Sequence, residues 1–194
     1  MRKVVVQAFD YSLDGIFAQE GTGFFEFCRE LPDDRGLEAW RLGSFQRAEV
    51  HVMGRRMYEG AAQFFPTAPA DHPYAEIMNS ATKVVFSSTL TTADWANTTI
   101  VNGDTAAEIE KLRQEGDGDI MVHGGISFVQ SMARLDLADE YRLAVFPYLA
   151  GSGPALFAGL APRPLELVSS TSFGNGMVGL VYRRHPAVTG AGRE

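Results

Sequence analysis

The 194 residues fit the usual length of one domain, and the proportions of 45% hydrophobic and 21% charged residues are ordinary for a globular protein. The net charge of −7 disfavours a nucleic-acid partner, and the single cysteine, Cys28, excludes an internal disulfide and a Cys-x-x-Cys zinc site. The apolar run at the N-terminus is too short for a signal peptide or a membrane span, so we expect a cytoplasmic protein without a membrane partner.

Short runs rich in valine and isoleucine alternate with segments whose apolar residues recur at helical spacing. In chain order, the predicted elements are a strand at 3–9, a helix at 34–47, a strand at 49–53, helices at 56–64 and 74–81, strands at 83–86 and 99–101, a helix at 104–116, a strand at 119–123, a helix at 126–135, and strands at 140–145, 165–173 and 177–184. Residues 10–32 are predicted to form a loop. Its phenylalanines, Phe24, Phe25 and Phe27, would form a wall for a flat ring, a lid on the core or a subunit contact.

The last two predicted strands are joined by Asn175 and Gly176, a pair that favours a hairpin because the turn requires positive φ angles. Strands that alternate with helices and end in such a hairpin predict an α/β fold with a mixed, mostly parallel sheet. We expect a single domain over residues 1–186 and a flexible tail over 187–194.

A glycine pair follows the predicted strand at 119–123 and opens a helix. Gly124 and Gly125 would let backbone N–H groups approach a pyrophosphate at the helix N-terminus, and Ser127 would add a hydroxyl. The alternative is a turn that only needs glycine for its backbone. A second glycine loop, with Asp14 and Gly15, follows the first strand and would cover a nicotinamide ring or form an ordinary turn.

Two further segments at strand ends suit phosphate groups. Arg55 and Arg56 open a helix, where positive charge is unfavourable unless an anion is bound there; the alternative is a solvated basic helix start. Ser87, Ser88 and Thr89 place three hydroxyls at the end of the strand at 83–86; the alternative is a polar loop. Arginines and serines beyond a pyrophosphate turn indicate an additional phosphate, which favours NADPH over NADH.

Five segments, taken in order and with their spacing, resemble the dihydrofolate reductase superfamily. The similarity is greatest to the C-terminal reductase domain of the bacterial bifunctional riboflavin-biosynthesis deaminase-reductase and its stand-alone relatives. The segments are SLDGIFA at 12–18, VMGRRMYE at 52–59, KVVFSST at 83–89, DIMVHGGISFVQ at 119–130 and DEYRLAVFPYLAGSGPALF at 139–157. The resemblance covers about residues 2–185, and we expect no deaminase domain of the bifunctional form, because its zinc site needs more cysteines than the one present.

The resemblance implies a dihydrofolate reductase-like, three-layer α/β/α fold and an NADPH-dependent oxidoreductase acting on CH-NH or CH-OH groups. The implied reaction is hydride transfer to a small nitrogen heterocycle, as in a 5-amino-6-(5-phosphoribosylamino)uracil reductase of riboflavin biosynthesis. The implied cofactor contacts are Asp14, Gly15, Ile16, Gly54, Arg55, Arg56, Met57, Ser87, Ser88, Thr89, Gly124, Gly125, Ser127 and Phe128. Alternatives are a dihydrofolate reductase proper and a nucleotide-binding homologue without this activity.

The resemblance also nominates an acid for the substrate. The run from Leu31 to Asp34 is similar to the entry of the first helix in classical dihydrofolate reductases, which nominates Asp34, whereas the classical spacing before Gly54 nominates Glu38. Asp34 is alternatively an N-cap of the predicted helix. We expect no metal, because the four histidines share no metal-binding spacing. A homodimer is expected, with the apolar strand region at 143–149 paired across a two-fold axis.

Overall fold

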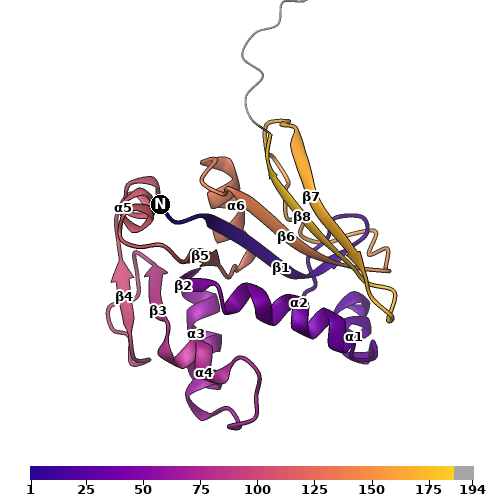
Figure 1. Cartoon of the computed structure of the whole chain (residues 1–194), viewed down its shortest axis with the longest axis horizontal. Coiled ribbons are helices and arrows are strands. Elements are labelled where there is room, and N and C mark those ends of the chain that lie inside the picture. Colours follow the sequence, from indigo (N-terminus) through magenta and orange to yellow (C-terminus); the bar gives the residue numbers. More distant parts are fainter. Residues whose placement is uncertain (186–194) are drawn as a thin grey trace, which may run out of the picture.

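The structure is a computed structural model that describes residues 1–185, in which eight strands form one sheet in the order β4-β3-β2-β5-β1-β6-β8-β7 (Figure 1). The strands are β1 (Val4–Ser12), β2 (Ala48–Gly54), β3 (Thr82–Phe86), β4 (Thr98–Val101), β5 (Asp119–Val122), β6 (Glu140–Phe146), β7 (Leu165–Ser172) and β8 (Val178–Arg184). The helices are α1 (Gly23–Glu30), α2 (Arg35–Phe45), α3 (Arg55–Phe64), a 3-10 turn η1 (Phe65–Thr67), α4 (Ala75–Ser80), α5 (Thr105–Gln114) and α6 (Ile126–Arg134). The predicted tail, 187–194, lies outside the described residues.

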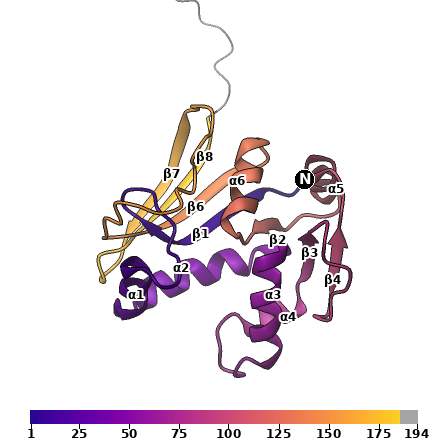
Figure 2. The same cartoon turned by 180° about the vertical axis from the view of Figure 1, so that it is seen from behind.

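The sheet confirms the predicted mixed α/β architecture. Neighbouring strands from β4 to β6 pair in parallel, whereas β8 pairs antiparallel with both β6 and β7. In the views of Figures 1 and 2, α1 to α4 lie on one side of the sheet, and α5 and α6 lie on the other. The β7–β8 hairpin has the expected turn, with Gly176 at a φ of +86°.

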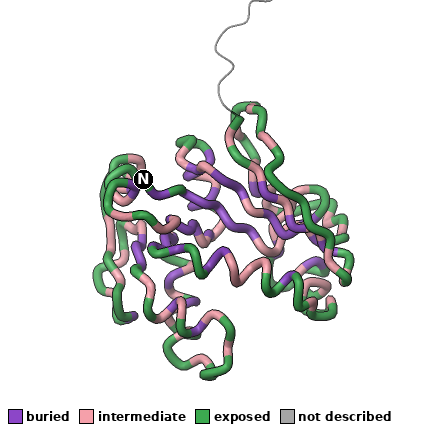
Figure 3. Tube along the Cα trace, viewed as in Figure 1, coloured by how far each residue is buried: buried purple, intermediate pink, exposed green. Residues whose placement is uncertain are grey.

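Successive side chains along each strand point to opposite faces of the sheet, so each face has its own hydrophobic core. Val4, Val6 and Ala8 of β1 pack in the cluster that contains Ile109 of α5 and Met132 of α6. The opposite face has two clusters, one under α3 and α4 and one under α1 and α2. Figure 3 shows the central strands as the most buried part of the chain. No helix in residues 1–185 is long and apolar enough to cross a membrane.

The loop prediction for residues 10–32 is wrong over α1. Phe24, Phe27, Cys28 and Leu31 recur at the spacing of one helical face, a pattern that was present in the sequence. Phe24 is buried and stacks on Tyr148 with ring centroids 5.1 Å apart. The phenylalanine cluster therefore packs against the core.

The predicted dimer surface at 143–149 is also corrected by the sheet order. β6 lies between β1 and β8 and is hydrogen-bonded on both sides, so its backbone has no free edge for a second copy. Leu143 is buried in the core, and Leu149 is exposed beyond the end of the strand. A homodimer remains a prediction, but it requires a different surface.

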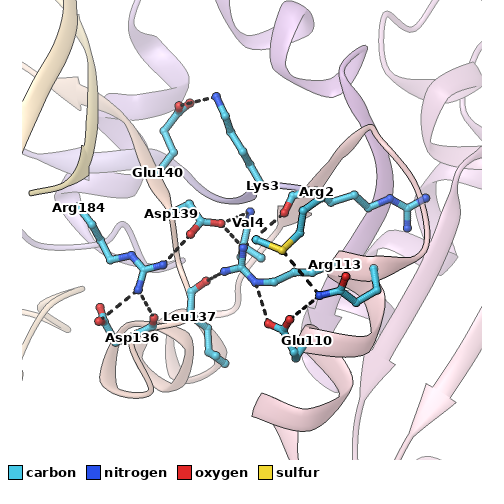
Figure 4. Close-up of polar contacts among 12 residues, drawn as sticks. Arg2, Lys3, Val4, Glu110, Arg113, Asp136, Leu137, Asp139, Glu140 and Arg184 are labelled. Atoms are coloured by element: carbon cyan, nitrogen blue, oxygen red, sulfur yellow. Dashed lines mark hydrogen bonds and ion pairs between the residues drawn. The ribbon is translucent and has the colours of Figure 1, made fainter. Parts of the chain in front are cut away.

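A polar network fixes the beginnings of the central strands (Figure 4). The Asp139 carboxylate accepts hydrogen bonds from the Val4 backbone N–H at 2.8 Å, from Arg113 and from Arg184 at 2.7 Å. Burial alone would raise the pKa of Asp139, but these hydrogen bonds hold it below its usual value. Arg113, which is itself buried, also donates to the Leu137 carbonyl at 2.5 Å. This network leaves the carboxyl ends of the strands, at the opposite edge of the sheet, available for a site.

Candidate functional site

Two adjoining cavities lie where β1, β2, β3 and β5 end, the edge at which open α/β sheets bind ligands. We call the larger one, of about 630 Å³, the polar cavity. Nine of the predicted cofactor residues line it: Gly54, Arg55, Arg56, Met57, Ser87, Ser88, Gly125, Ser127 and Phe128. The strand order thus brings together three segments that are distant in sequence.

The glycine turn after β5 has the geometry of an anion-binding helix start. Gly124 has a φ of +92°, a conformation that favours glycine, and its carbonyl accepts a hydrogen bond from the Gly54 N–H at 3.3 Å. Gly125 is the N-cap of α6 and provides no side-chain cap, so the first N–H groups of this helix remain available. A Cβ atom placed on Gly125 would meet nothing within 4 Å, which shows that open space lies beside this backbone.

Basic and hydroxyl groups face the same cavity. Arg55 lies 3.7 Å from Glu59, whereas no ion pair joins Arg56 to any of residues 1–185. The Ser87 oxygen accepts hydrogen bonds from the N–H groups of Thr89 and Leu90, at 3.2 and 2.9 Å, so its own hydrogen can be donated to a ligand. Open backbone, cationic side chains and hydroxyls together fit the phosphates of a dinucleotide.

The glycine loop after β1 lies apart from both cavities. Asp14 accepts hydrogen bonds from the Ser12 hydroxyl and from the N–H groups of Ala150 and Gly151, and these bonds lower its pKa to about 2. Asp14, Gly15, Ile16 and Thr89 line neither cavity. Their contact with a cofactor remains a prediction, and the visible role of Asp14 is to fasten this loop to residues 150–151.

We call the second space, of about 350 Å³, the aromatic cavity. Its aromatic lining consists of Phe9, Phe17, Phe45, Phe64, Phe65, His72, Tyr74 and His123. The rings of Phe45 and Tyr74 lie 4.6 Å apart, and Phe9 stacks on Phe45 at 5.9 Å. Such walls suit a flat ring. Sequence reasoning did not identify this lining, because its rings come singly from separate elements.

Three polar side chains also line the aromatic cavity, and two of them, Gln7 and Asp10, escaped prediction. The amide of Gln7, which is 6% exposed, has no hydrogen-bond partner at either its nitrogen or its oxygen. Burial raises the pKa of the Asp10 carboxyl, and the charge of Arg41 opposes that rise. The Arg41 guanidinium lies 4.8 Å from the Phe9 ring centroid, and two of its nitrogens have no hydrogen-bond partner. The only sequence signal was that Gln7 and Asp10 interrupt an apolar strand.

One histidine, His123, lines the aromatic cavity next to the glycine turn and is paired with a second, His51. His51 and His123 are in contact through Nδ1 and Nε2, and their rings stack with centroids 4.7 Å apart. Burial, together with the charge of Lys83, lowers the pKa of His51 to about 4. Burial and the neighbouring His51 hold the pKa of His123 well below its ordinary value. Both imidazoles are therefore neutral near pH 7.

The two acids nominated from the sequence lie elsewhere. Asp34 and Glu38 line a third space of about 240 Å³, the acidic cavity, which shares Arg41 and Tyr74 with the aromatic cavity. Asp34 accepts the Leu37 N–H at 2.9 Å as the N-cap of α2, and hydrogen bonds from backbone N–H groups lower its pKa. The structure therefore shows the capping role, and a catalytic role for either acid remains a prediction. Within residues 1–185 no three metal-ligating side chains are grouped.

Comparison with known proteins gives the following matches. The family model described as the RibD C-terminal domain matches residues 2–179. The protein YyaP of Bacillus subtilis (strain 168) is 27% identical over 175 residues, which are 88% of this chain and 89% of that protein.

Solved structures share the fold. A putative riboflavin biosynthesis protein from Shewanella sp. PV-4 superposes with a TM-score of 0.75 and 25% identity, covering 96% of this chain and 100% of that one. Dihydrofolate reductase from Enterococcus faecalis, complexed with NADP(H) and RAB-propyl, gives a TM-score of 0.60 with 14% identity, covering 95% and 97% of the two chains. The second likeness shows the fold alone.

Proposed function

The chain belongs to the RibD C-terminal domain family, and from that premise we propose that it is an NADPH-dependent reductase that transfers a hydride to a small nitrogen heterocycle. The resemblance to this family implies a riboflavin-pathway substrate of the 5-amino-6-(5-phosphoribosylamino)uracil type. The proposal concerns the two adjoining cavities and divides the reactants between them.

The observation that carries the proposal is the wall shared by the two cavities. Met57, Gly125 and Ile126 line both the polar and the aromatic cavity. A dinucleotide whose phosphates lie among Arg56, Ser87 and the glycine turn can therefore extend its ring past this wall into the aromatic cavity. There its ring would meet a second flat ring, which is the geometry that hydride transfer requires.

Bound NADPH would supply a hydride from its nicotinamide ring. The protein's part is to hold two rings together, to exclude water with aromatic side chains, and to deliver a proton. Asp10 is the only carboxylic acid that lines the aromatic cavity among the described residues. Its raised pKa increases the protonated fraction near neutral pH, so we assign the proton donation to its carboxyl oxygen.

Calorimetric titration with NADPH and, separately, NADH tests the proposal. We expect NADPH to bind at least about tenfold more tightly, a difference of roughly 1.4 kcal/mol. Absence of binding by both nucleotides would refute the reductase proposal, and equal binding would refute the assignment of an additional phosphate site.

The rival activity, a dihydrofolate reductase proper, predicts turnover of dihydrofolate that methotrexate inhibits. It would draw its acid from Asp34 or Glu38, both of which lie in the acidic cavity. A nucleotide-binding homologue without catalysis would bind NADPH but would not oxidise it, whichever heterocycle is added. The predicted homodimer is tested separately by sedimentation at micromolar concentration, where a monomer would contradict it.

A further inference from the structure

The amide of Gln7 is buried and unpaired beside the aromatic cavity. Gln7 lies on β1 between Val6 and Ala8, which pack on the opposite face of the sheet, and it is one of the residues that line the cavity. Leaving a buried amide donor or acceptor unpaired costs roughly 1–3 kcal/mol. Here both atoms of one side chain are unpaired, although protein interiors generally satisfy such groups.

The unpaired amide nitrogen and oxygen of Gln7 indicate which chemical groups of a ligand could pair with them. A glutamine amide offers one acceptor and a donor side by side, so it pairs with a ring edge that carries an N–H next to a carbonyl or ring nitrogen. The same bidentate pairing lets glutamine bind the edge of a nucleic-acid base. The surrounding rings of Phe9, Phe45 and Tyr74 suit the faces of a planar molecule.

The charges of the aromatic cavity cancel while Asp10 is ionised, because its negative charge then balances the positive charge of Arg41. His123 is neutral for the reason given above, and His72 accepts a hydrogen bond from the Tyr74 N–H at its Nδ1, 3.3 Å away. A phosphate in this apolar space would therefore add uncompensated negative charge.

The neighbouring space is no better for an anion. A substituent that leaves the aromatic cavity between Arg41 and Tyr74 enters the acidic cavity. Three carboxylates line that space, against the two guanidinium groups of Arg35 and Arg41. The carboxylates are Asp33, Asp34 and Glu38. An uncharged or hydroxylated substituent fits there, whereas a phosphate would face repulsion.

We propose that the substrate of this chain is a flat, uncharged lactam ring without a phosphate group, and that Gln7 binds its N–H and carbonyl edge. This inference rests on the proposed reductase function and narrows its substrate class. It separates the chain from a reductase of phosphorylated aminouracils, because three carboxylates face two guanidinium groups in the acidic cavity, which a substituent of the ring would enter.

The first test uses Gln7→Leu, with lumazine, a flat bicyclic lactam without phosphate, as the probe. Lumazine binding is titrated by its fluorescence, with NADPH present and again without it, and NADPH binding is measured separately on the same samples. We expect Gln7→Leu to weaken lumazine binding at least about tenfold, to leave NADPH binding unchanged, and to keep or raise the Tm, because an apolar side chain removes an unpaired buried amide.

Gln130→Leu is the matched control. Gln130 of α6 donates to the Ala155 carbonyl at 2.9 Å and lines neither the aromatic nor the polar cavity. We expect Gln130→Leu to have a lower Tm, because it loses this hydrogen bond, and to bind lumazine like the wild type. A Gln7→Leu protein with a lowered Tm and wild-type lumazine binding would show that Gln7 is structural and overturn the inference.

The second test concerns the phosphate. 5-Amino-6-(ribosylamino)uracil and its 5-phosphate are compared as ligands and as oxidants of NADPH, and we expect the form without phosphate to bind more tightly. Tighter binding of the phosphate form, or no binding of lumazine with or without NADPH, would overturn the inference. If NADPH still binds normally in either case, the reductase proposal stands. If NADPH does not bind, the reductase proposal itself is refuted.

Discussion

The polar and the aromatic cavity share a wall but are built in different ways. The polar cavity is lined mainly by short consecutive runs at or just after strand ends, such as 54–57, 86–88 and 125–128. The aromatic cavity has the runs 7–10 and 123–126, but most of its rings come from α2, α3, η1 and the segment before α4. Phosphate recognition through backbone and helix starts is therefore a local property, whereas a pocket for a ring depends on how distant elements pack.

The largest effect is expected from Asp10→Asn, which tests the chemistry assigned to the aromatic cavity. Asparagine keeps the shape but cannot donate an acidic proton, so kcat should fall by about 10²- to 10⁴-fold with NADPH affinity unchanged. The wild-type rate should fall as pH rises above the raised pKa of Asp10, because its protonated fraction declines, and this dependence should vanish in the variant. The rate and its pH dependence are both measured as NADPH oxidation with dihydrofolate or the aminouracils as acceptors. An Asp10→Asn variant with the wild-type rate would contradict the assignment.

An intermediate effect is expected from Arg56→Ala, which tests the polar cavity alone. Loss of one charged hydrogen bond to a phosphate should weaken NADPH binding by roughly 1.5–3 kcal/mol, or about 10- to 100-fold, while NADH binding changes little. Arg134→Ala, an exposed arginine in the last turn of α6, serves as the control for a general change in charge. If both variants weakened NADPH equally, Arg56 would have no specific role.

The smallest effect is expected from the acid nominated by sequence. Asp34→Ala removes the cap of α2 and should lower the free energy of unfolding modestly, as measured by urea denaturation. Asp34→Asn keeps a capping oxygen and should retain both stability and reduction rate. A rate loss in Asp34→Asn comparable to that of Asp10→Asn would return the catalytic role to Asp34 and join the acidic cavity to the reaction.

Several parts of the fold and of the polar cavity could be predicted from sequence because their signals are local. Valine-rich runs predicted the central strands, and the Asn175-Gly176 pair predicted the hairpin. Gly124, Arg56 and Ser87 were identified because each follows a strand end. Asp10 was not, since its importance depends on Arg41, thirty-one positions later in the sequence and packed beside it only once α2 lies against β1.

Other errors have the same origin. The helical spacing in α1 was visible, but the glycines around it favoured a loop interpretation. The strand at 140–145 was correctly predicted, yet its pairing on both sides by β1 and β8 follows from the strand order alone. Local sequence patterns predicted which residues form strands, and packing determines which of their faces and edges stay free.

The wall formed by Met57, Gly125 and Ile126 has a thermodynamic consequence. Whatever the two occupants are, a shift of this wall that improves the fit of one changes the affinity for the other. Linkage requires that effect to be reciprocal, so the factor by which the first ligand tightens the second equals the factor by which the second tightens the first. Where this coupling is positive, each ligand is bound more tightly in the presence of the other.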